Sequence, residues 1–568
     1  MTAPVFIDYS PQTPITAAFL NSLSNLAWNV MGGPSQTIAT DLPTLQANLQ
    51  IPPAVSIPFL SVKSPAYGAK GDGVTDDTVA INNCILAAVA MGGGTIYFPP
   101  GTYLVSNINP SSTSWDTNCG IWVLNNNINL LGAGKGATKI RLANNANAHV
   151  VCFGQRTNGT VAVQNCSIAH IEIDGNSANQ NIGLVNATDY HNAGLMVQSG
   201  AVRVNADNLY VHNCVFYGIG YQRDGIYNCY IRNVYISQTG VDAIDWKNDS
   251  DNSYGNVIDN VIADNWGTLP VATTGDPSAA FDLRSGITAT NLVVQTPGQS
   301  AVAGLRFQNG TPGTKPFQAS KAAFYIMVGN GTSGSAGVRV ISRDVTLNDG
   351  FATAWDDGHS FSEPDCRYDA LQGYNNVTSG FRFWNNASAG TLASTNASRG
   401  LIARSNGVSG IICDGNISET DFIDCDVRSN TTYGYDLRVG TSNIRIIDGS
   451  ATGNGASTAA NINQNNTNPI IRDVSGYRTY QSASASVAID STGTKSFSIA
   501  HGMPFTPSTL DVQLTLRRNT NVGDWSDGFL WVTSCDSTNV NGQVRVLTAS
   551  ATSGAVVDVV ATVNSNAR

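Results

Sequence analysis

Residues 66–103 read AYGAKGDGVTDDTVAINNCILAAVAMGGGTIYFPPGTY, and the glycines and clustered carboxylates at their front pose the first question. A phosphate-binding loop of the Walker type would close on Gly-Lys followed by Ser or Thr, and no such triplet follows. An EF-hand calcium loop would alternate its ligands and end on Glu. Asp72, Asp76 and Asp77 keep neither that spacing nor a final Glu. A structural role therefore explains this stretch better than a phosphate or a metal does.

The middle of the same stretch is typical of a helix. Thr75 or Asp76 can cap its start, and the negative charge of Asp76 and Asp77 suits its first turn. Residues TIYFPPGTY then predict a short strand, a proline corner and the start of another strand. The predicted helix ends at glycines 92–94, and its apolar stripe consists of Val79, Ile81, Ile85, Leu86, Val89 and Ala90.

This block resembles the pectate-lyase-like opening segment of right-handed parallel β-helices in bacteriophage tailspikes. The resemblance is carried by YGAKGDGVTDDTVAINNCI at 67–85 and GGGTIYFPPGTYLVS at 92–106. It implies an all-β solenoid in which the block forms a capping helix and the first coil rather than the active site. It does not select a reaction, because tailspikes and β-helical hydrolases and lyases share such a start.

The composition of the 568 residues agrees with a β-rich, turn-rich protein, because only 12% of them are charged while Gly, Asn, Ser and Thr abound. The net charge of −10 argues against a nucleic-acid partner, which requires a basic surface. No run of roughly 18 apolar residues predicts membrane insertion. The opening MTAPVFIDYSPQ shows no secretory signal.

The ten cysteines are scattered, without the paired spacing of a metal site. Seven follow Asn or Asp, and several then enter strand-like runs such as NCSIAHIEI, NCVFYGI and NCYIRNVYI. We expect them to be small apolar side chains that point into a core and stay reduced. A disulfide framework is the alternative.

The chain repeats itself loosely from about residue 120 to 475. One series consists of GLMV at 194, AIDW at 243, AFDL at 280, GLRF at 304, GFRF at 380, GLIA at 400 and GYDL at 434. A second consists of HIEIDG, NLYVHN, NVYISQ, NVIADN and NLVVQT, whose last four members start at 208, 233, 260 and 291. Short strands at this period predict a solenoid of stacked coils with apolar ladders inside. An array of β-sandwiches is the alternative, but it would not explain the helical block.

The two ends of the chain differ from this repeat. Residues 1–58 predict an amphipathic helix that Thr13 caps and Pro14 opens, a second short helix at TDLPTLQANL, and a stiff linker at IPPAVSIP. By resemblance to tailspikes, this module attaches to the virion. Residues 59–478 are the predicted β-helix, and residues 479–568 alternate like antiparallel strands. The segment IAHGMPFTPSTLDVQL resembles C-terminal β-sandwich modules of phage tail proteins, which serve trimerisation or sugar contact; His501 within it is expected to be structural.

The first candidate for a catalytic site is GVDAIDWKNDSDNS, residues 240–253. Hydrolysis of a glycosidic bond needs a carboxylic acid and a second carboxylate. Asp242 and Asp245 would reach one groove only if Asp242 lies on the turn before the strand, which Gly240 permits. This D-x-x-D resembles the paired aspartates of O-antigen-cleaving podovirus tailspikes. That family pattern includes a third carboxylate, for which Asp224 is the candidate.

Candidate substrate contacts are Trp246 and Lys247 within the same stretch, Asp282 and Arg284 about one coil further on, and Trp266. The alternative is structural, because AFDLRSG and GYDLRVG repeat the same shape and an outward Asp beside Lys or Arg can be a solvated pair. Trp355 and Trp384 could also stack on sugar rings, although burial is the commoner fate of Trp.

The second candidate is AWDDGHSFSEPDCRYD, residues 354–369, which is predicted to interrupt the repeat as a long loop. Its candidate substrate-binding residues are Asp356, Asp357 and Glu363, and His359 and Asp365 lie among them. A loop that only bonds to itself is the alternative.

The sequence as a whole predicts a homotrimeric tailspike that hydrolyses host O-antigen or capsule at internal bonds, without metal or cofactor. It would be part of the virion, with the host polysaccharide and a phage tail or baseplate protein as partners. The second hypothesis is a polysaccharide lyase, with Lys247 or Arg284 near the reacting uronate and Asp245, Asp249 and Asp251 at a calcium ion. The third is a sugar-binding adhesin without catalysis.

Overall fold

The chain divides into units Met1–Pro58 and Phe59–Arg568. The structure, a computed structural model, describes residues 59–568 apart from 111–116, 156–160, 183–191, 248–252, 275–276, 285, 309–318, 385–395, 416, 467–468, 478–479, 489–490, 504–505, 519–527, 547–555 and 565–568. The helices and linker predicted within 1–58 lie outside the described residues, as do Asp249 and Asp251.

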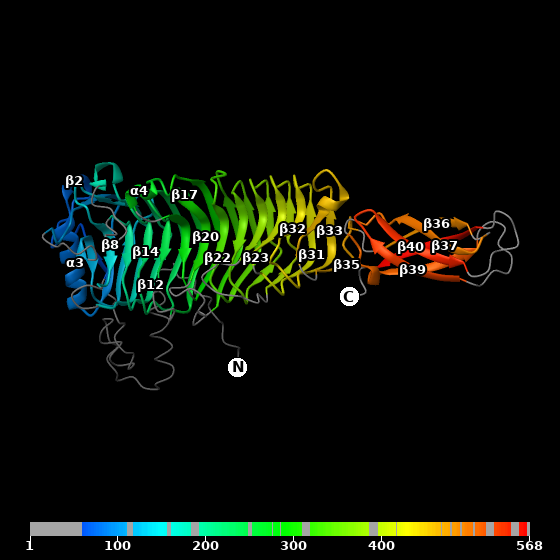
Figure 1. Ribbon diagram of the computed structural model, residues 1–568. Helices are drawn as coiled ribbons and strands as arrows, with labels where there is room; N and C mark the ends of the chain where they lie inside the picture. Colours follow the sequence, from blue (N-terminus) through cyan, green and yellow to red (C-terminus); the bar gives the residue numbers. More distant parts are fainter. Residues whose placement is uncertain are drawn as a thin grey trace, which may run out of the picture. The chain divides into compact units, whose positions relative to one another are not determined.

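Most of the described chain forms two long parallel sheets that stack one coil on the next, as the strands coloured blue to yellow in Figure 1 show. Sheet A contains β1 (Phe59–Ser61), β2 (Asp72–Asp76), β3 (Gly94–Phe98), β4 (Gly101–Val105), β6 (Ile128–Gly132), β7 (Thr138–Leu142), β9 (Gln164–Ala169), β10 (Glu172–Asp174), β12 (Val202–Asp207), β13 (Tyr210–Cys214), β15 (Tyr230–Thr239), β17 (Asn256–Trp266), β19 (Ile287–Pro297), β21 (Ser320–Val328), β23 (Val345–Thr353), β25 (Arg367–Asp369), β26 (Gln372–Tyr374), β28 (Ala397–Arg399), β29 (Ile402–Arg404), β31 (Asp421–Arg428), β33 (Arg445–Thr452) and β35 (Ile470–Arg472).

Sheet B contains β5 (Cys119–Val123), β8 (His149–Phe153), β11 (Leu195–Val197), β14 (Ile219–Tyr221), β16 (Ile244–Trp246), β18 (Ser278–Leu283), β20 (Ala301–Gln308), β22 (Ala336–Ile341), β24 (Asp357–Phe361), β27 (Ser379–Trp384), β30 (Ser409–Asp414), β32 (Tyr433–Leu437) and β34 (Ile462–Gln464). One apolar core lies between the two sheets. These coils form the right-handed parallel β-helix that the sequence predicts.

The opening block has the predicted order of elements with shifted boundaries. Helix α3 spans Thr78–Ala90, and residues 72–76, expected to lead into it, form strand β2 instead. The acidic side chains organise these turns: Asp77 accepts hydrogen bonds from the backbone of Lys70 and Gly71, at 2.6 and 2.9 Å. The predicted stripe is partly wrong, because Val79 and Leu86 face solvent.

Asparagine explains the repeated sequence NVYISQ, NVIADN and NLVVQT. Asn233, Asn260 and Asn291 have φ values of 57°, 53° and 54°, and each bends its strand within sheet A. Asn enters this left-handed region at lower cost than most residues do. The second repeat series thus marks a corner of the coil.

Most of the first repeat series forms sheet B, where residues such as Leu195, Ile244 and Phe281 point inward in one continuous register. The exception is GLIA at 400, which leads into β29 of sheet A; the sheet B strand of that region is β30. The ten cysteines are free thiols, and nine are buried, which confirms the expectation of reduced apolar side chains.

Residues 480–564 contain antiparallel strands, coloured orange and red in Figure 1. One sheet consists of β36 (Tyr480–Ala488), β41 (Val556–Asn564) and β38 (Val512–Arg518), and the other of β37 (Gly493–Ala500), β40 (Asn539–Val546) and β39 (Gly528–Cys535). Both contribute to one apolar cluster. Short helical segments elsewhere are α4 (Val271–Thr274) and 3₁₀ turns η2 (Ser177–Asn179), η5 (Thr458–Asn461) and η6 (Thr509–Asp511). No helix in the described part of the chain is long and apolar enough to cross a membrane.

Candidate active site

Strand β16 presents one carboxylate on the outward face of sheet B. Ile244 and Trp246 belong to the core, so Asp245 between them points outward. Asp242 precedes the strand, in the turn that follows Gly240. A Cβ atom on Gly240 would lie 1.9 Å from the carbonyl oxygen of Val215, so this turn requires glycine.

The next coil brings a third carboxylate beside these two. Asp282 of β18 lies directly opposite Asp245 in the strand register. Oxygen atoms of Asp242, Asp245 and Asp282 all lie within 4.8 Å of one another. The exposed fractions of these residues are 1%, 0% and 1%. We call these three residues the carboxylate cluster.

Asp282 is held ionised from the following coil. The Nε and Nη2 atoms of Arg306 donate to its two oxygens at 2.9 and 2.7 Å, and Gln308 donates at 2.7 Å. Burial alone would raise the pKa of Asp282, but the charge and hydrogen bonds of Arg306 outweigh burial and lower it.

Lys247 connects the cluster to a tyrosine. Its ammonium lies 3.0 Å from Asp245 Oδ2 and donates to the hydroxyl of Tyr217 at 2.9 Å. Lys247 and Tyr217 are both buried. Lys247 therefore lies between a carboxylate and a phenol.

The three carboxylates could in principle offer oxygen ligands to a cation. Asp245 and Asp282, however, already pair with Lys247 and Arg306. A divalent cation would have to displace these two positive side chains, so the residues present fit a metal poorly.

Asp242 is anchored to strand β18, next to the segment that connects β17 with it. Its Oδ1 accepts a hydrogen bond from the backbone N–H of Ala279 at 2.7 Å. The segment from β17 to β18 also contacts Arg306, whose Nη1 donates to the carbonyl of Pro277 at 3.3 Å. The carboxylates of the cluster have almost no exposed surface.

Two of the predicted substrate contacts are wrong, because the side chains are buried. Trp246 and Trp266 are fully buried in the core, so neither can stack on a sugar ring. Successive side chains of a strand point to opposite faces of the sheet. Because Asp245 points outward, its neighbour Trp246 must point into the core. Trp355 is buried too, whereas Trp384 is half-buried.

Asp224 and Arg284 lie at the edges of the arrangement. Asp224 lies in the turn after β14, where its backbone carbonyl accepts a hydrogen bond from the N–H of Gly200. Among the described residues, it does not belong to the carboxylate cluster. Arg284 follows β18, and its charge contributes to the lowered pKa of Asp282.

The second candidate stretch is not the predicted interruption, because residues 357–361 form the regular strand β24. Asp356 accepts hydrogen bonds from Gly334 and Thr378 in a turn, and Asp357 accepts from Ser379 at 2.6 Å. Burial raises the pKa of Asp357.

Glu363 is 3% exposed, and burial raises its pKa. His359 points into the core and stacks on Phe381. The acidic residues of this stretch therefore serve separate turns and strands and do not form one cluster.

Arg306, Gln308 and Tyr217 are not among the site residues predicted from the sequence. A signal for Arg306 was present, because aligning AFDLR with GLRFQ as consecutive coils places Asp282 opposite Arg306. Tyr217 lies in the connection between β13 and β14, and the sequence repeat does not predict which residues such a connection contacts.

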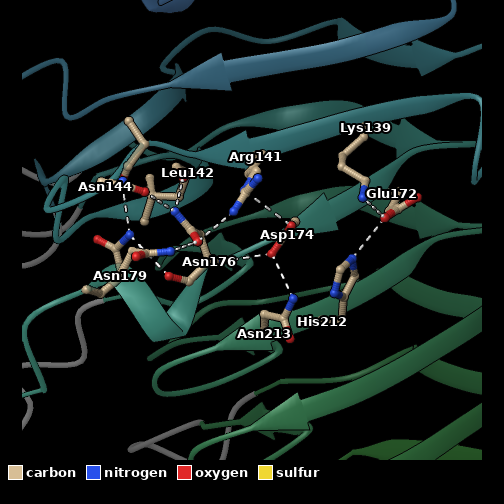
Figure 2. Close-up of polar contacts among 12 residues, drawn as sticks. Lys139, Arg141, Leu142, Asn144, Glu172, Asp174, Asn176, Asn179, His212 and Asn213 are labelled. Carbon is tan, nitrogen blue, oxygen red and sulfur yellow. Dashed lines mark hydrogen bonds and ion pairs between the residues drawn. The ribbon is translucent and has the colours of Figure 1, made fainter. Parts of the chain in front are cut away.

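Figure 2 shows a second polar cluster, on sheet A, that the sequence analysis also missed. Glu172 Oε1 lies 2.9 Å from His212 Nε2 and 2.7 Å from Lys139 Nζ, and Asp174 lies 3.6 Å from Arg141 Nε. These residues lie on the adjacent strands β7, β10 and β13. Because each carboxylate has a positive or ionisable partner, the cluster is explained as a link between coils.

Residues 59–269 match a protein-family model described as rhamnogalacturonase A/epimerase, pectate lyase-like. This segment thus has the pectate-lyase-like β-helix that its opening block predicts, which confirms the resemblance.

Among curated proteins, the chain is similar to two enzymes of Azotobacter vinelandii. It is 30% identical to mannuronan C5-epimerase AlgE2 over 267 residues, which is 44% of this chain and 25% of that protein. It is 38% identical to alginate lyase 7 over 113 residues, which is 20% of this chain and 12% of that protein. The matched parts thus span a quarter or less of these relatives.

Among solved structures, the chain is similar to the N-terminal fragment of bacteriophage phi29 gene product 12, with a TM-score of 0.49 and 17% identity over 74% of this chain and 71% of that one. It is also similar to the tailspike protein of E. coli bacteriophage HK620 in complex with a hexasaccharide, with a TM-score of 0.47 and 12% identity over 89% and 93%. Likeness at these scores does not define a reaction.

Proposed function

We propose that this protein is a tailspike-type enzyme that hydrolyses internal glycosidic bonds of a bacterial surface polysaccharide, with Asp242 and Asp245 as its catalytic pair. The observation that carries the proposal is the carboxylate cluster, in which three buried side chains from two coils have oxygens within 4.8 Å of one another.

The chemistry follows from the charges in the cluster. Asp282 is ionised by Arg306, and a further ionised carboxylate at such a distance is disfavoured unless it is compensated. We assign the role of carboxylate to Asp245, whose charge Lys247 balances at 3.0 Å, and the role of proton donor to Asp242. Those are the two groups that glycoside hydrolysis requires, and a short separation, about 5–5.5 Å between carboxyl groups, is typical of retaining enzymes.

The relatives support the substrate class, because the names of both Azotobacter proteins specify polysaccharides, mannuronan and alginate. The resemblance of the opening block supports a tailspike. Attachment of residues 1–58 to the virion tail, homotrimer formation and binding of O-antigen or capsule are parts of the same proposal.

The test is to incubate the full chain with purified O-antigens, capsular polysaccharides and alginate, and to measure polymer length and new reducing ends. Hydrolysis yields shorter chains with saturated ends. Binding without shortening of any polymer would favour the adhesin instead.

A second candidate reaction is abstraction of the proton at C5 of a uronate, the step that lyases and C5-epimerases share. The contact between Lys247 and Tyr217 favours it, because an ammonium at 2.9 Å stabilises a phenolate that can act as the base.

Deuterium from solvent distinguishes the two reactions. A C5 abstraction in D₂O either introduces deuterium at C5 or yields an unsaturated end that absorbs ultraviolet light, which saturated sugars do not. Hydrolysis by carboxylates does neither, so the absence of both signals from shortened products would exclude the second candidate.

A further inference from the structure

A row of positive side chains continues from the carboxylate cluster along the outward face of sheet B. In the strand register Asp282 lies opposite Arg306, Arg306 opposite Arg339, Arg339 opposite Ser360, and Ser360 opposite Arg382. Neighbouring strands lie roughly 4.8 Å apart, so the guanidinium groups of Arg306 and Arg339 come from adjacent strands.

The outer members of this row are neutralised by carboxylates. Arg306 is held by both oxygens of Asp282. Arg382 lies 2.9 Å from Asp414 and 3.6 Å from Asp357. Each of these two guanidinium groups therefore has a negative partner within the protein.

Arg339 differs from both. Its Nη2 donates to the backbone carbonyl of Gly334, its Nε is buried without an acceptor, and it forms no ion pair with any described residue. Burial and the neighbouring charge of Arg306 lower the pKa of Arg339, and the charge of Asp357 on the adjacent strand opposes them only in part. A half-buried guanidinium beside a second one is unfavourable unless an anion joins it.

An aromatic side chain lies next to this unpaired charge. The indole Nε1 of Trp384 donates to Ser360 Oγ at 2.9 Å, and Ser360 lies between Arg339 and Arg382 in the register. Trp384 is half-buried and outward-facing, so part of its indole is available for contact. An apolar ring beside a fixed positive group is the combination that orients a sugar carrying a negative charge.

We propose that Arg339 and Trp384 form a subsite for an acidic sugar residue, in which Arg339 binds a uronate carboxylate and Trp384 contacts the face of the pyranose ring. The subsite rests on the proposed function, and it implies that the substrate is a polymer that contains uronate residues. Along sheet B, Arg339 lies two strands beyond Asp282 and Trp384 lies four strands beyond it, so the subsite would hold a part of the polymer away from the reacting bond.

The subsite is tested by equilibrium binding, so that a failure of the proposed catalysis does not affect the result. All variants carry Asp245→Asn, and the probes are oligomannuronate, the same oligosaccharide with its carboxyl groups reduced, and inorganic phosphate. A charge-assisted contact predicts that Arg339→Met weakens oligomannuronate binding roughly 10- to 100-fold. Trp384→Ala should weaken binding of the acidic and the reduced probe alike.

The matched control is Arg367→Met, on sheet A, where the arginine pairs with Asp369 at 2.6 Å. It should leave affinity unchanged. Absence of oligomannuronate binding to the parent protein, or equal affinity for the reduced probe, would overturn the proposal. Displacement by phosphate as strong as by oligomannuronate would also overturn it, because the site would then bind any anion.

Thermal unfolding of the free protein distinguishes a binding role from a structural one. Because Arg339 lacks an internal ion pair, Arg339→Met should leave the Tm unchanged or raise it. A Tm lower by several degrees would show that Arg339 stabilises the fold, and it would contradict the subsite.

Discussion

His359 occupies an inward position of β24, between Val338 and Phe381 in the strand register. Its ring stacks on Phe381 with centroids 4.9 Å apart, and Nε2 lies 3.2 Å from the hydroxyl of Tyr325. Burial lowers its pKa from 6.5 to about 3. The protein therefore folds with this imidazole neutral.

This burial makes stability depend on pH. Between pH 6.5 and about 3 the unfolded chain binds a proton at His359 that the folded chain does not, so stability falls as pH falls through this window. The loss is roughly 1 kcal/mol per pH unit between the two pKa values. We expect His359→Phe to show a smaller drop in Tm than the parent between pH 7 and pH 4. His170→Asn, at an exposed position, should change nothing, and an equal drop in all three proteins would refute the assignment.

The carboxylate cluster predicts that activity does not depend on a metal. Lys247 and Arg306 already neutralise Asp245 and Asp282, and hydrolysis by two carboxylates requires no ion. Depolymerisation rates should therefore be unchanged after treatment with EDTA. Loss of activity that calcium restores would instead favour the lyase hypothesis.

At the scale of elements, a ladder of buried asparagines joins successive coils. The Oδ1 of Asn406 accepts from the backbone N–H and the side chain of Asn376, both at 3.1 Å. Asn430 and Asn454 repeat the pattern at 2.9–3.0 Å. Each side chain satisfies two donors of the preceding coil and aligns the turns.

Removal of one rung should destabilise the β-helix. Asn430→Ala removes the acceptor of the backbone N–H of Asn406 and one of the two acceptors of its side-chain amide, at about 1–3 kcal/mol for each buried N–H left unpaired. Chemical denaturation should show this loss. Asn348→Ala, at a half-buried position of β23, is the control, and equal stability of the two variants would contradict the role of the ladder.

The sequence predicts elements well where a local pattern marks them. The repeated Asn reveals corners because residues such as Asn233 and Asn260 must adopt positive φ. The stretch around His359 was wrongly predicted as a loop, because a polar residue occupies an inward position that is apolar in neighbouring coils.

The same limit applies to the candidate site. Asp242 and Asp245 lie three residues apart, so their proximity could be predicted from one strand and its turn. The pairing of Asp282 with Arg306 depends on the register between coils, and the connections between those coils differ in length. Repeat spacing alone therefore cannot assign the partner.

At the scale of the whole molecule, the antiparallel region exposes apolar side chains. Phe529 and Trp531 of β39 are 63% and 37% exposed, and Leu510 is 87% exposed. Exposed apolar groups of this size suit a contact with another chain. They add to the sequence-based prediction of a homotrimer.

We expect a trimer for the full chain at micromolar concentration in light scattering. The double variant Leu510→Ser and Phe529→Ser should weaken the assembly, because both exposed apolar groups are removed. A clean monomer of the parent protein would contradict the predicted assembly.

The central claim is that Asp242 and Asp245 perform the cleavage, and the most direct measurement is the rate of reducing-end formation by Asp242→Asn and Asp245→Asn. Asn preserves shape and hydrogen bonding at a turn but cannot exchange the proton, so each variant should lose roughly 10²–10⁴-fold in rate while it stays folded. The matched control is Asp436→Asn on the sheet B strand β32, where Asp436 pairs with Arg438 at 2.8 Å. This variant should retain full activity. Normal cleavage by both the Asp242 and the Asp245 variant would contradict the account.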